Sequence, residues 1–125
     1  MITCIHHVAL KCHGEEEYEK VKDFYQNVLD LKMKGEWAGG CHLTAGNAVL
    51  EIFRKGAEEG GTGSIPHYSL GVDDMDKVCE VLAKAGYEVY NGPRDIELPI
   101  DPPVPATIAF VKGPLGEEIE FFMEK

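Results

Sequence analysis

A short internal sequence repeat is the feature that most constrains the fold of this chain. Residues 5–10 read IHHVAL and residues 67–70 read HYSL, so in both places a His is followed three residues later by a Leu. These two His, His7 and His67, are 67 − 7 = 60 residues apart in a chain of 125. A self-similarity whose period is about half the chain predicts two copies of one supersecondary unit.

The two halves also share one order of predicted elements. In the first half, apolar spacing predicts a strand at 4–12, a helix from Glu15 to about Leu29, a bent strand pair at 32–43 and a strand at 47–53. The second half predicts a strand at 67–72, a helix from Met75 to Ala85, a strand beginning at 87–90, and a hairpin of 106–111 and 117–123. We therefore predict two βαβββ modules, about residues 1–54 and 65–125, in a single α+β domain spanning 1–125.

Three connecting segments are predicted from Gly and Pro. Residues 55–64 contain four Gly without apolar periodicity, which predicts a flexible linker between the modules. The sequence Asn91-Gly92-Pro93 predicts a turn. The acidic, Pro-rich segment Asp95–Pro105 predicts a long loop, which either closes over a site or is a surface excursion.

Composition and charge restrict the class of protein. With 44% apolar residues, 125 residues can bury a real core, whereas half of them would be marginal alone. The formal charge of −10 and the lack of a basic stripe argue against a nucleic-acid partner. No signal peptide and no apolar run of roughly 20 residues is visible, so we expect a cytoplasmic protein with no membrane partner. The cysteines, Cys4, Cys12, Cys41 and Cys79, form no C-x-x-C pair, which favours reduced thiols.

Strand parity places a His or a Glu on the face opposite the main apolar face in each of four predicted strands. These residues are His7, Glu51, His67 and Glu120. Strand faces exposed to water are routinely polar, so each residue alone is most simply a surface residue. The repetition favours a second interpretation, a site in a shared concavity. Two imidazoles and two carboxylates suit a divalent ion such as Ni²⁺, Zn²⁺, Co²⁺ or Mn²⁺.

The chain resembles the vicinal oxygen chelate superfamily, and within it is most similar to bacterial glyoxalase I enzymes (lactoylglutathione lyases). The resemblance covers essentially the whole chain. It rests on IHHVAL at 5–10, FYQNVLDL at 24–31, AVLE at 48–51, HYSLGV at 67–72, and IAFV at 108–111 leading into GEEIE at 116–120. It implies paired βαβββ modules in a curved, open, eight-stranded mixed sheet, with one divalent metal ion per site on the four residues named above. A homodimer is expected, because such a sheet leaves apolar edge to cover.

The resemblance also implies an activity, the isomerisation of the thiol hemithioacetal of methylglyoxal through a metal-bound enediolate. Glu120 would be the base and Glu51 its counterpart that returns the proton, with His7 and His67 as fixed ligands. Lys11 stands where these enzymes have an Arg for an anionic substrate tail, and Lys55 stands where they have an Asn, so the thiol is left open. The alternatives are another metal-dependent epimerase or isomerase, and a non-catalytic protein that binds a small molecule.

Overall fold

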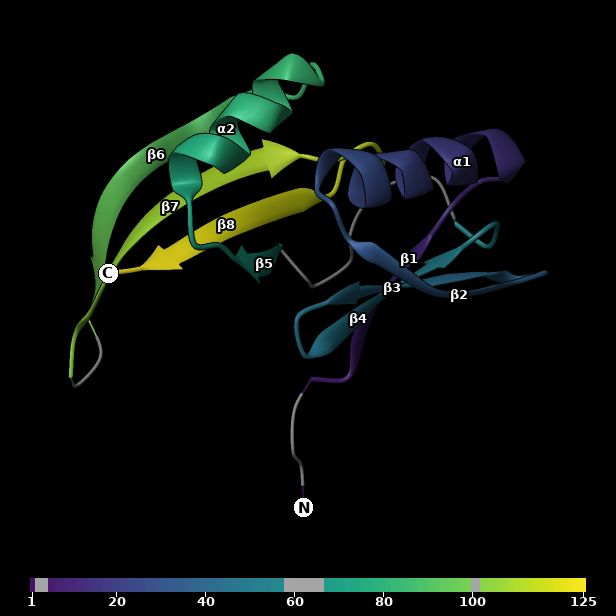
Figure 1. The fold of residues 1–125 in the computed structure, drawn as a ribbon, viewed down its shortest axis with the longest axis horizontal. Coiled ribbons are helices and arrows are strands. Elements are labelled where there is room, and N and C mark those ends of the chain that lie inside the picture. The colour runs from purple at the N-terminus through teal and green to yellow at the C-terminus, as the bar shows by residue number, and fades with distance from the viewer. Residues whose placement is uncertain (2–4, 58–66, 100–101) are drawn as a thin grey trace. The chain divides into compact units, whose positions relative to one another are not determined.

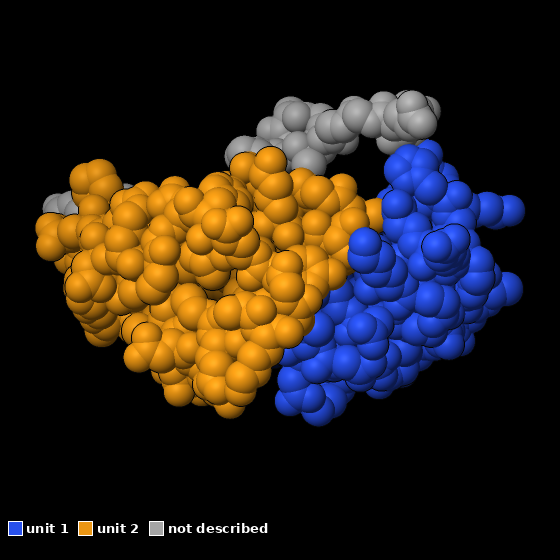
Figure 2. All heavy atoms as spheres, turned by 90° about the horizontal axis from the view of Figure 1, so that it is seen from above, with its two compact units in different colours: residues 1–60 blue, residues 61–125 orange. Residues whose placement is uncertain are grey.

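The computed structural model describes residues 1, 5–57, 67–99 and 102–125. The chain divides into two compact units, residues 1–60 (unit 1) and residues 61–125 (unit 2), which are coloured blue and orange in Figure 2. Each unit has its own sheet and its own helical segment. Most of the predicted Gly-rich linker, from residue 58 onward, lies outside the described residues.

Unit 1 is a four-stranded mixed sheet with one helical segment (Figure 1). Its elements are β1 (His7–Lys11), α1 (Glu15–Asp23), the π-helix η1 (Phe24–Val28), β2 (Lys32–Trp37), β3 (Gly40–Ala45) and β4 (Ala48–Phe53). The strand order is β1-β4-β3-β2. The β1 and β4 strands are parallel, and the other neighbours are antiparallel. The last strand of the unit therefore lies beside the first.

Unit 2 has the same topology. Its elements are β5 (Tyr68–Gly71), α2 (Met75–Lys84), β6 (Val89–Leu98), β7 (Val104–Lys112) and β8 (Glu118–Glu124), in the order β5-β8-β7-β6. Again the first and last strands are parallel and the other neighbours antiparallel. This confirms the predicted α+β fold of two βαβββ modules.

The α2 helix begins and ends at residues suited to those positions. The Asp74 side chain caps the helix by accepting a hydrogen bond from the Lys77 backbone N–H at 2.9 Å. Gly86, just past its end, has φ +85°, a left-handed conformation that costs Gly little. Leu82 is fully buried, and the helix lies along β6 and β7. The predicted boundaries, Met75 and Ala85, are correct to within one residue.

The β6 strand corrects two predictions. Asn91-Gly92-Pro93 is not a turn, since β6 passes through it with two register shifts against β7. A Cβ on Gly92 would lie 2.4 Å from the Ile108 carbonyl oxygen, so this is a bulge that needs Gly. The predicted loop Asp95–Pro105 is mostly strand as well, because residues 95–98 pair with 104–107. The Thr107 hydroxyl donates to Asp95 Oδ1 at 2.7 Å across this hairpin. The prolines at 102 and 103 lie in the short connection between the strands, of which residues 100–101 are outside the description.

Candidate metal centre

Each sheet has one face covered by its helix and one face directed away from it (Figure 1). In unit 1, the residues at register positions that share one face of β3 and β4 are apolar and at most 4% exposed: Cys41, Leu43, Leu50 and Ile52. The opposite face of the same two strands carries His42 and Glu51, which are register partners. In unit 2, Ile119 and Phe121 are buried while Glu120 alternates with them on β8. The apolar side of each sheet is therefore core, and the predicted ligands lie on the other side.

His7 and Glu51 form the first pair of predicted ligands. Glu51 lies opposite Ala9 in the parallel β1–β4 pair, two residues beyond His7 on the same face of β1. The distance from His7 Nε2 to Glu51 Oε1 is 3.7 Å. The Glu51 side chain is 16% exposed and that of His7 is 43% exposed. The carboxylate is thus largely withdrawn from water beside an imidazole that remains accessible.

His67 and Glu120 repeat this arrangement in unit 2. Glu120 lies opposite Ser69 in the parallel β5–β8 pair, again two residues beyond the His. The distance from His67 Nε2 to Glu120 Oε2 is 3.5 Å, and the two side chains are 36% and 13% exposed. The two pairs therefore occupy equivalent register positions, with the same ring nitrogen facing the carboxylate.

The geometry of each pair suits two ligands of one ion better than a hydrogen bond. An N–H···O bond would bring the two atoms to about 2.7–3.2 Å. Nitrogen and oxygen ligands lie about 2.0–2.2 Å from a zinc-type ion, which separates two of them by about 3.0–3.4 Å at angles between octahedral and tetrahedral. The observed 3.7 and 3.5 Å lie above that range, but nearer to it than to the hydrogen-bond range. The donor set and spacing of each pair therefore fit a divalent ion.

Within the described residues, no group of three or more His, Cys, Asp or Glu side chains is arranged to hold a metal ion. Each unit by itself supplies one pair. A centre that uses all four residues stays a prediction.

His6 contacts the other nitrogen of the His7 ring. The Nδ1 atoms of His6 and His7 lie 3.0 Å apart, so one of them donates a hydrogen bond to the other. If His7 Nδ1 carries the proton, its Nε2 has a free lone pair directed toward Glu51. A neighbour that fixes the tautomer of a ligating imidazole is a common feature of metal sites.

His42 is the site residue that sequence reasoning missed. Its Nε2 lies 2.5 Å from Glu51 Oε2, in a half-buried position. The β3 and β4 strands are joined by a two-residue turn at Gly46 and Asn47. Ala45 therefore pairs with Ala48, and His42 pairs with Glu51 three residues farther from the turn on each strand. Recognition of that two-residue turn in the sequence would have placed the two side chains on the same face.

Lys11 lies on the same face of β1 as His7, because four residues separate them. At about 3.3 Å per residue, their Cα atoms are about 13 Å apart along the strand. Its side chain is exposed. This position suits a contact with a remote part of a ligand and excludes direct participation at the His7–Glu51 pair.

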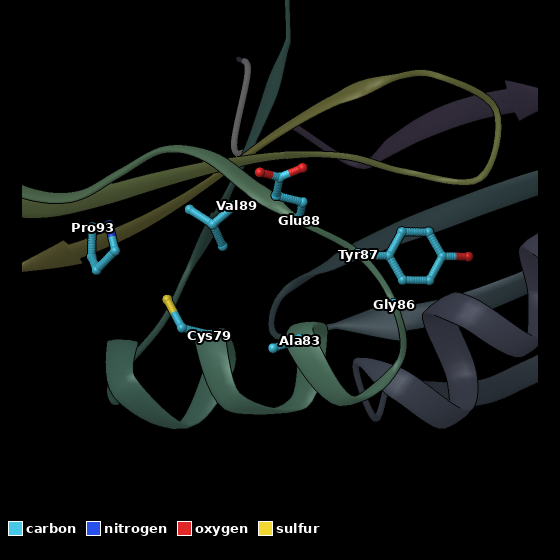
Figure 3. A pocket seen from close by; sticks show the side chains of 7 residues that line it. All are labelled: Cys79, Ala83, Gly86, Tyr87, Glu88, Val89 and Pro93. Atoms are coloured by element: carbon cyan, nitrogen blue, oxygen red, sulfur yellow. The ribbon is translucent and has the colours of Figure 1, made fainter.

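A separate hollow in unit 2 lies between α2 and β6 (Figure 3). It has a volume of about 440 Å³, and Cys79, Ala83 and Val89 are among its lining side chains. Burial raises the pKa of the Cys79 thiol, with a smaller contribution from the nearby Asp76 carboxylate. A thiol with a raised pKa is protonated at neutral pH and a poor nucleophile. This hollow lacks the His–Glu pairing that marks the candidate centre.

Sequence comparison connects the chain to one family. Residues 5–121 match the sequence model of the Glyoxalase/Bleomycin resistance protein/Dioxygenase superfamily. A comparison with curated proteins finds no match.

Solved structures with the same fold include three proteins of different description. The antibiotic binding protein TnmS3 from Streptomyces sp. CB03234 is 21% identical, with a TM-score of 0.71 over 99% of this chain and 98% of that one. A lactoylglutathione lyase from Agrobacterium tumefaciens is 17% identical, with a TM-score of 0.69 over 98% of this chain and 95% of that one. A glyoxalase/bleomycin resistance protein/dioxygenase from Alicyclobacillus acidocaldarius is 14% identical, with a TM-score of 0.69 over 97% and 91%. At these identities the likeness shows the fold alone.

Proposed function

Because the chain belongs to the glyoxalase/bleomycin resistance protein/dioxygenase superfamily, we propose that it is a metal-dependent isomerase of glyoxalase I type. The observation that carries the proposal is the repeated pair: a His at the start of the first strand and a Glu on the neighbouring last strand, at equivalent register positions in both units. We further propose that His7, Glu51, His67 and Glu120 together hold one divalent ion, Ni²⁺ or Zn²⁺ by preference. The substrate would be the hemithioacetal that forms between methylglyoxal and a thiol.

The reaction is an internal proton transfer with no net redox change. A base removes the proton from the carbon that carries the sulfur, and a proton is delivered to the neighbouring carbonyl carbon. The hydroxyl and carbonyl positions exchange, which gives an α-hydroxy thioester with the same atoms and electrons. A bound divalent cation would supply stabilisation of the negative charge that develops on the two oxygens.

The residues of this chain divide these tasks between them. Glu120 is proposed as the base that takes the proton, and Glu51 as the group that returns it after receiving it from Glu120. His7 and His67 would remain neutral and fixed. Lys11, whose ammonium group carries a positive charge along β1, would attract an anionic tail of the thiol. Lys11 presents a point charge without the paired N–H groups of an Arg, so the proposal leaves the identity of the thiol open.

The assay uses methylglyoxal with glutathione, with bacillithiol and with smaller thiols, on protein loaded separately with Ni²⁺ and Zn²⁺. We expect thioester formation with at least one thiol. Glu120→Gln should abolish turnover and retain the metal, since Gln keeps an oxygen ligand and cannot accept the proton. Absence of turnover with every thiol and both metals would contradict the proposal.

A second candidate function is the non-catalytic binding of a small molecule. The Trp37 side chain is 41% exposed and lies edge-to-face with His42 at 5.1 Å, which places an accessible aromatic surface beside the His7–Glu51 pair. The similar fold of TnmS3, an antibiotic binding protein, is compatible with this use. Tight binding of an aromatic ligand, with quenching of Trp37 fluorescence and no turnover of any thiol adduct, would favour this function over the isomerase.

A further inference from the structure

The two units differ at one position beside their His–Glu pairs. In unit 1, the residue opposite Glu51 in the antiparallel register is His42. In unit 2, the residue opposite Glu120 is Phe110. The two strand pairs have equivalent places in the two sheets, so His42 and Phe110 are structural counterparts. One carboxylate therefore has a polar neighbour where the other has an apolar one.

The two oxygens of Glu51 have separate partners. Oε1 faces His7 Nε2 at 3.7 Å, and Oε2 lies 2.5 Å from His42 Nε2. The second contact is shorter than the usual N–H···O range, and a carboxylate can only accept, so we assign the proton to His42 Nε2 as the donor of a short hydrogen bond. A nitrogen that carries a proton has no lone pair for a metal ion. His42 is thus a hydrogen-bond donor to a proposed ligand and not itself a ligand through this nitrogen.

The His42 ring is held in this orientation by its neighbours. It stacks on the His7 ring, with 6.4 Å between centroids and an interplanar angle of 25°. On another side it meets Trp37 edge-to-face, with 5.1 Å between centroids. Neighbours on two sides favour this orientation of the ring and so support the hydrogen bond to Glu51.

Glu120 has a different environment. His67 is the ion-pair partner that the described residues give it, at 3.5 Å. The Phe110 ring lies edge-to-face with His67, with 5.4 Å between centroids, and has no hydrogen-bonding group to offer to the carboxylate. At the equivalent strand position in unit 2, one Glu120 oxygen therefore has no hydrogen-bond partner among the residues that the structure describes.

We propose that His42 is a positioning residue that fixes Glu51 as a permanent metal ligand, whereas Phe110 leaves Glu120 free to move, to take the substrate proton and to return it. Glu51 would then lose the proton-returning role given to it in the proposed function. The inference rests on the proposed function, since it assigns unequal roles to two carboxylates of the same site. A carboxylate that accepts a hydrogen bond from a rigid donor keeps its position at the ion. A carboxylate without such a hydrogen bond can rotate toward the substrate. One sequence difference between the units would then break the symmetry of the repeat.

The first measurement concerns the hydrogen bond and requires no metal. Nitrogen-15 NMR of the His side chains should show His42 with a proton on Nε2, and the signal is assigned by its absence in His42→Gln. A bare Nε2 on His42 would overturn the inference whatever the protein catalyses. On addition of Zn²⁺ the Nε2 proton should persist. Its loss would make His42 a ligand and also overturn the inference.

The second measurement compares metal affinity in a matched pair of variants. His42→Phe copies the situation in unit 2, and we expect Zn²⁺ to bind about 10- to 100-fold more weakly, as for other partners of ligating groups. His42→Gln keeps an N–H donor at a similar reach and should restore most of the affinity. Equal melting temperatures of the two variants separate this effect from misfolding. Equal Zn²⁺ affinity in wild type and both variants would overturn the inference and leave the proposed function standing.

The third measurement tests the freedom of Glu120. Phe110→His adds a hydrogen-bond donor opposite Glu120. We expect kcat to fall, KM to stay the same and the Zn²⁺ affinity to be no weaker than in the wild type. An unchanged kcat in this variant would contradict the role given to Phe110. If the wild type binds Zn²⁺ but turns over no thiol adduct, the proposed function fails and the first two measurements still decide the role of His42. If the wild type binds no divalent ion, both proposals fail.

Discussion

Tyr18→Phe tests the hydrogen-bond cluster that fastens α1 to the edge of the unit 1 sheet. The Tyr18 side chain is fully buried, and its hydroxyl donates to Glu36 Oε2 on β2 at 2.6 Å. The Arg54 guanidinium lies 4.2 Å from the centre of the Tyr18 ring. Phe keeps the ring and the contact with Arg54 and removes only the hydroxyl. The substitution therefore removes the hydrogen bond between α1 and β2, together with the hydrogen bond between the hydroxyl and Cys41.

The expected loss of stability follows from the partners that remain. A hydrogen bond to a charged acceptor contributes about 1.5–3 kcal/mol. The Glu36 side chain is 37% exposed and also accepts from Lys22 at 3.0 Å, so water and Lys22 replace part of what is lost. We therefore expect Tyr18→Phe to lower the free energy of unfolding by about 1–2 kcal/mol.

The same residue predicts how stability changes at alkaline pH. Burial, with hydrogen bonds to Cys41 and Glu36, raises the pKa of Tyr18 above its ordinary value of 10.0. Above pH 10 the unfolded chain releases the Tyr18 proton while the folded chain keeps it. Its contribution to stability is therefore complete below pH 10 and is lost as the pH rises further. Tyr18→Phe should lack this part of the alkaline destabilisation.

Urea unfolding at pH 7 and above pH 10 measures both effects. The fluorescence of Trp37, the single Trp of the chain, reports on unit 1. We expect a lower unfolding midpoint for the variant at pH 7 with an unchanged m value, and a smaller difference between the two proteins at high pH. Equal unfolding free energies at pH 7, together with equal alkaline slopes, would refute this account of the cluster.

Four further predictions concern other parts of the chain. Asp74→Ala removes the α2 cap and should cost about 1 kcal/mol by urea unfolding, whereas Asp74→Asn should cost much less. Gly92→Ala forces a Cβ to within 2.4 Å of the Ile108 carbonyl oxygen and should cost about 1–3 kcal/mol; a loss no larger than that of a surface substitution would argue against the bulge. Chelation of the bound metal should lower the melting temperature, because about 2.7 kcal/mol of stabilisation at 100-fold excess over Kd is removed; an unchanged melting temperature would contradict a metal-bound resting state. The exposed Trp37 and Tyr90 on the outer strands β2 and β6 support a homodimer, so light scattering at micromolar concentration should give twice the chain mass, and a monomer would contradict it.

The repeat that relates His7 and His67, with the apolar spacing of each half, was sufficient to predict two units with the same order of elements along the chain. Strand parity is a local property, and the burial of Leu50, Ile52, Ile119 and Phe121 follows it closely. The order of strands within each sheet was not predicted, because pairing depends on contacts that are distant along the chain. No helix in the described part of the chain is long and apolar enough to cross a membrane.

The β6 strand was mispredicted because its Gly and Pro residues were interpreted as turn and loop signals, and its pairing with β7 was not foreseen. The Gly92-Pro93 sequence is typical of turns, yet the strand accommodates it as a bulge against β7. Farther along, the alternation of Ile96 and Leu98 with charged residues was a strand signal that the prolines at 102, 103 and 105 obscured. Pairing with Val104–Thr107 supplied the hydrogen bonds that local propensity alone did not predict.

His42 shows a different limit of sequence reasoning. Its role depends on the register between β3 and β4, and one residue of slip would turn it toward the core. A search confined to the repeated positions could not find it, because its counterpart in unit 2 is Phe110. The feature that makes the two units unequal is therefore invisible to an argument from their similarity.

The most direct test of the central claim is the number of divalent ions bound per chain when each pair is removed. One ion on four ligands predicts one Zn²⁺ or Ni²⁺ per chain by elemental analysis of the wild type. It also predicts loss of that ion in His7→Ala/Glu51→Ala and equally in His67→Ala/Glu120→Ala. Two ions per wild-type chain, or full metal content in either double variant, would contradict the claim that both pairs serve one centre.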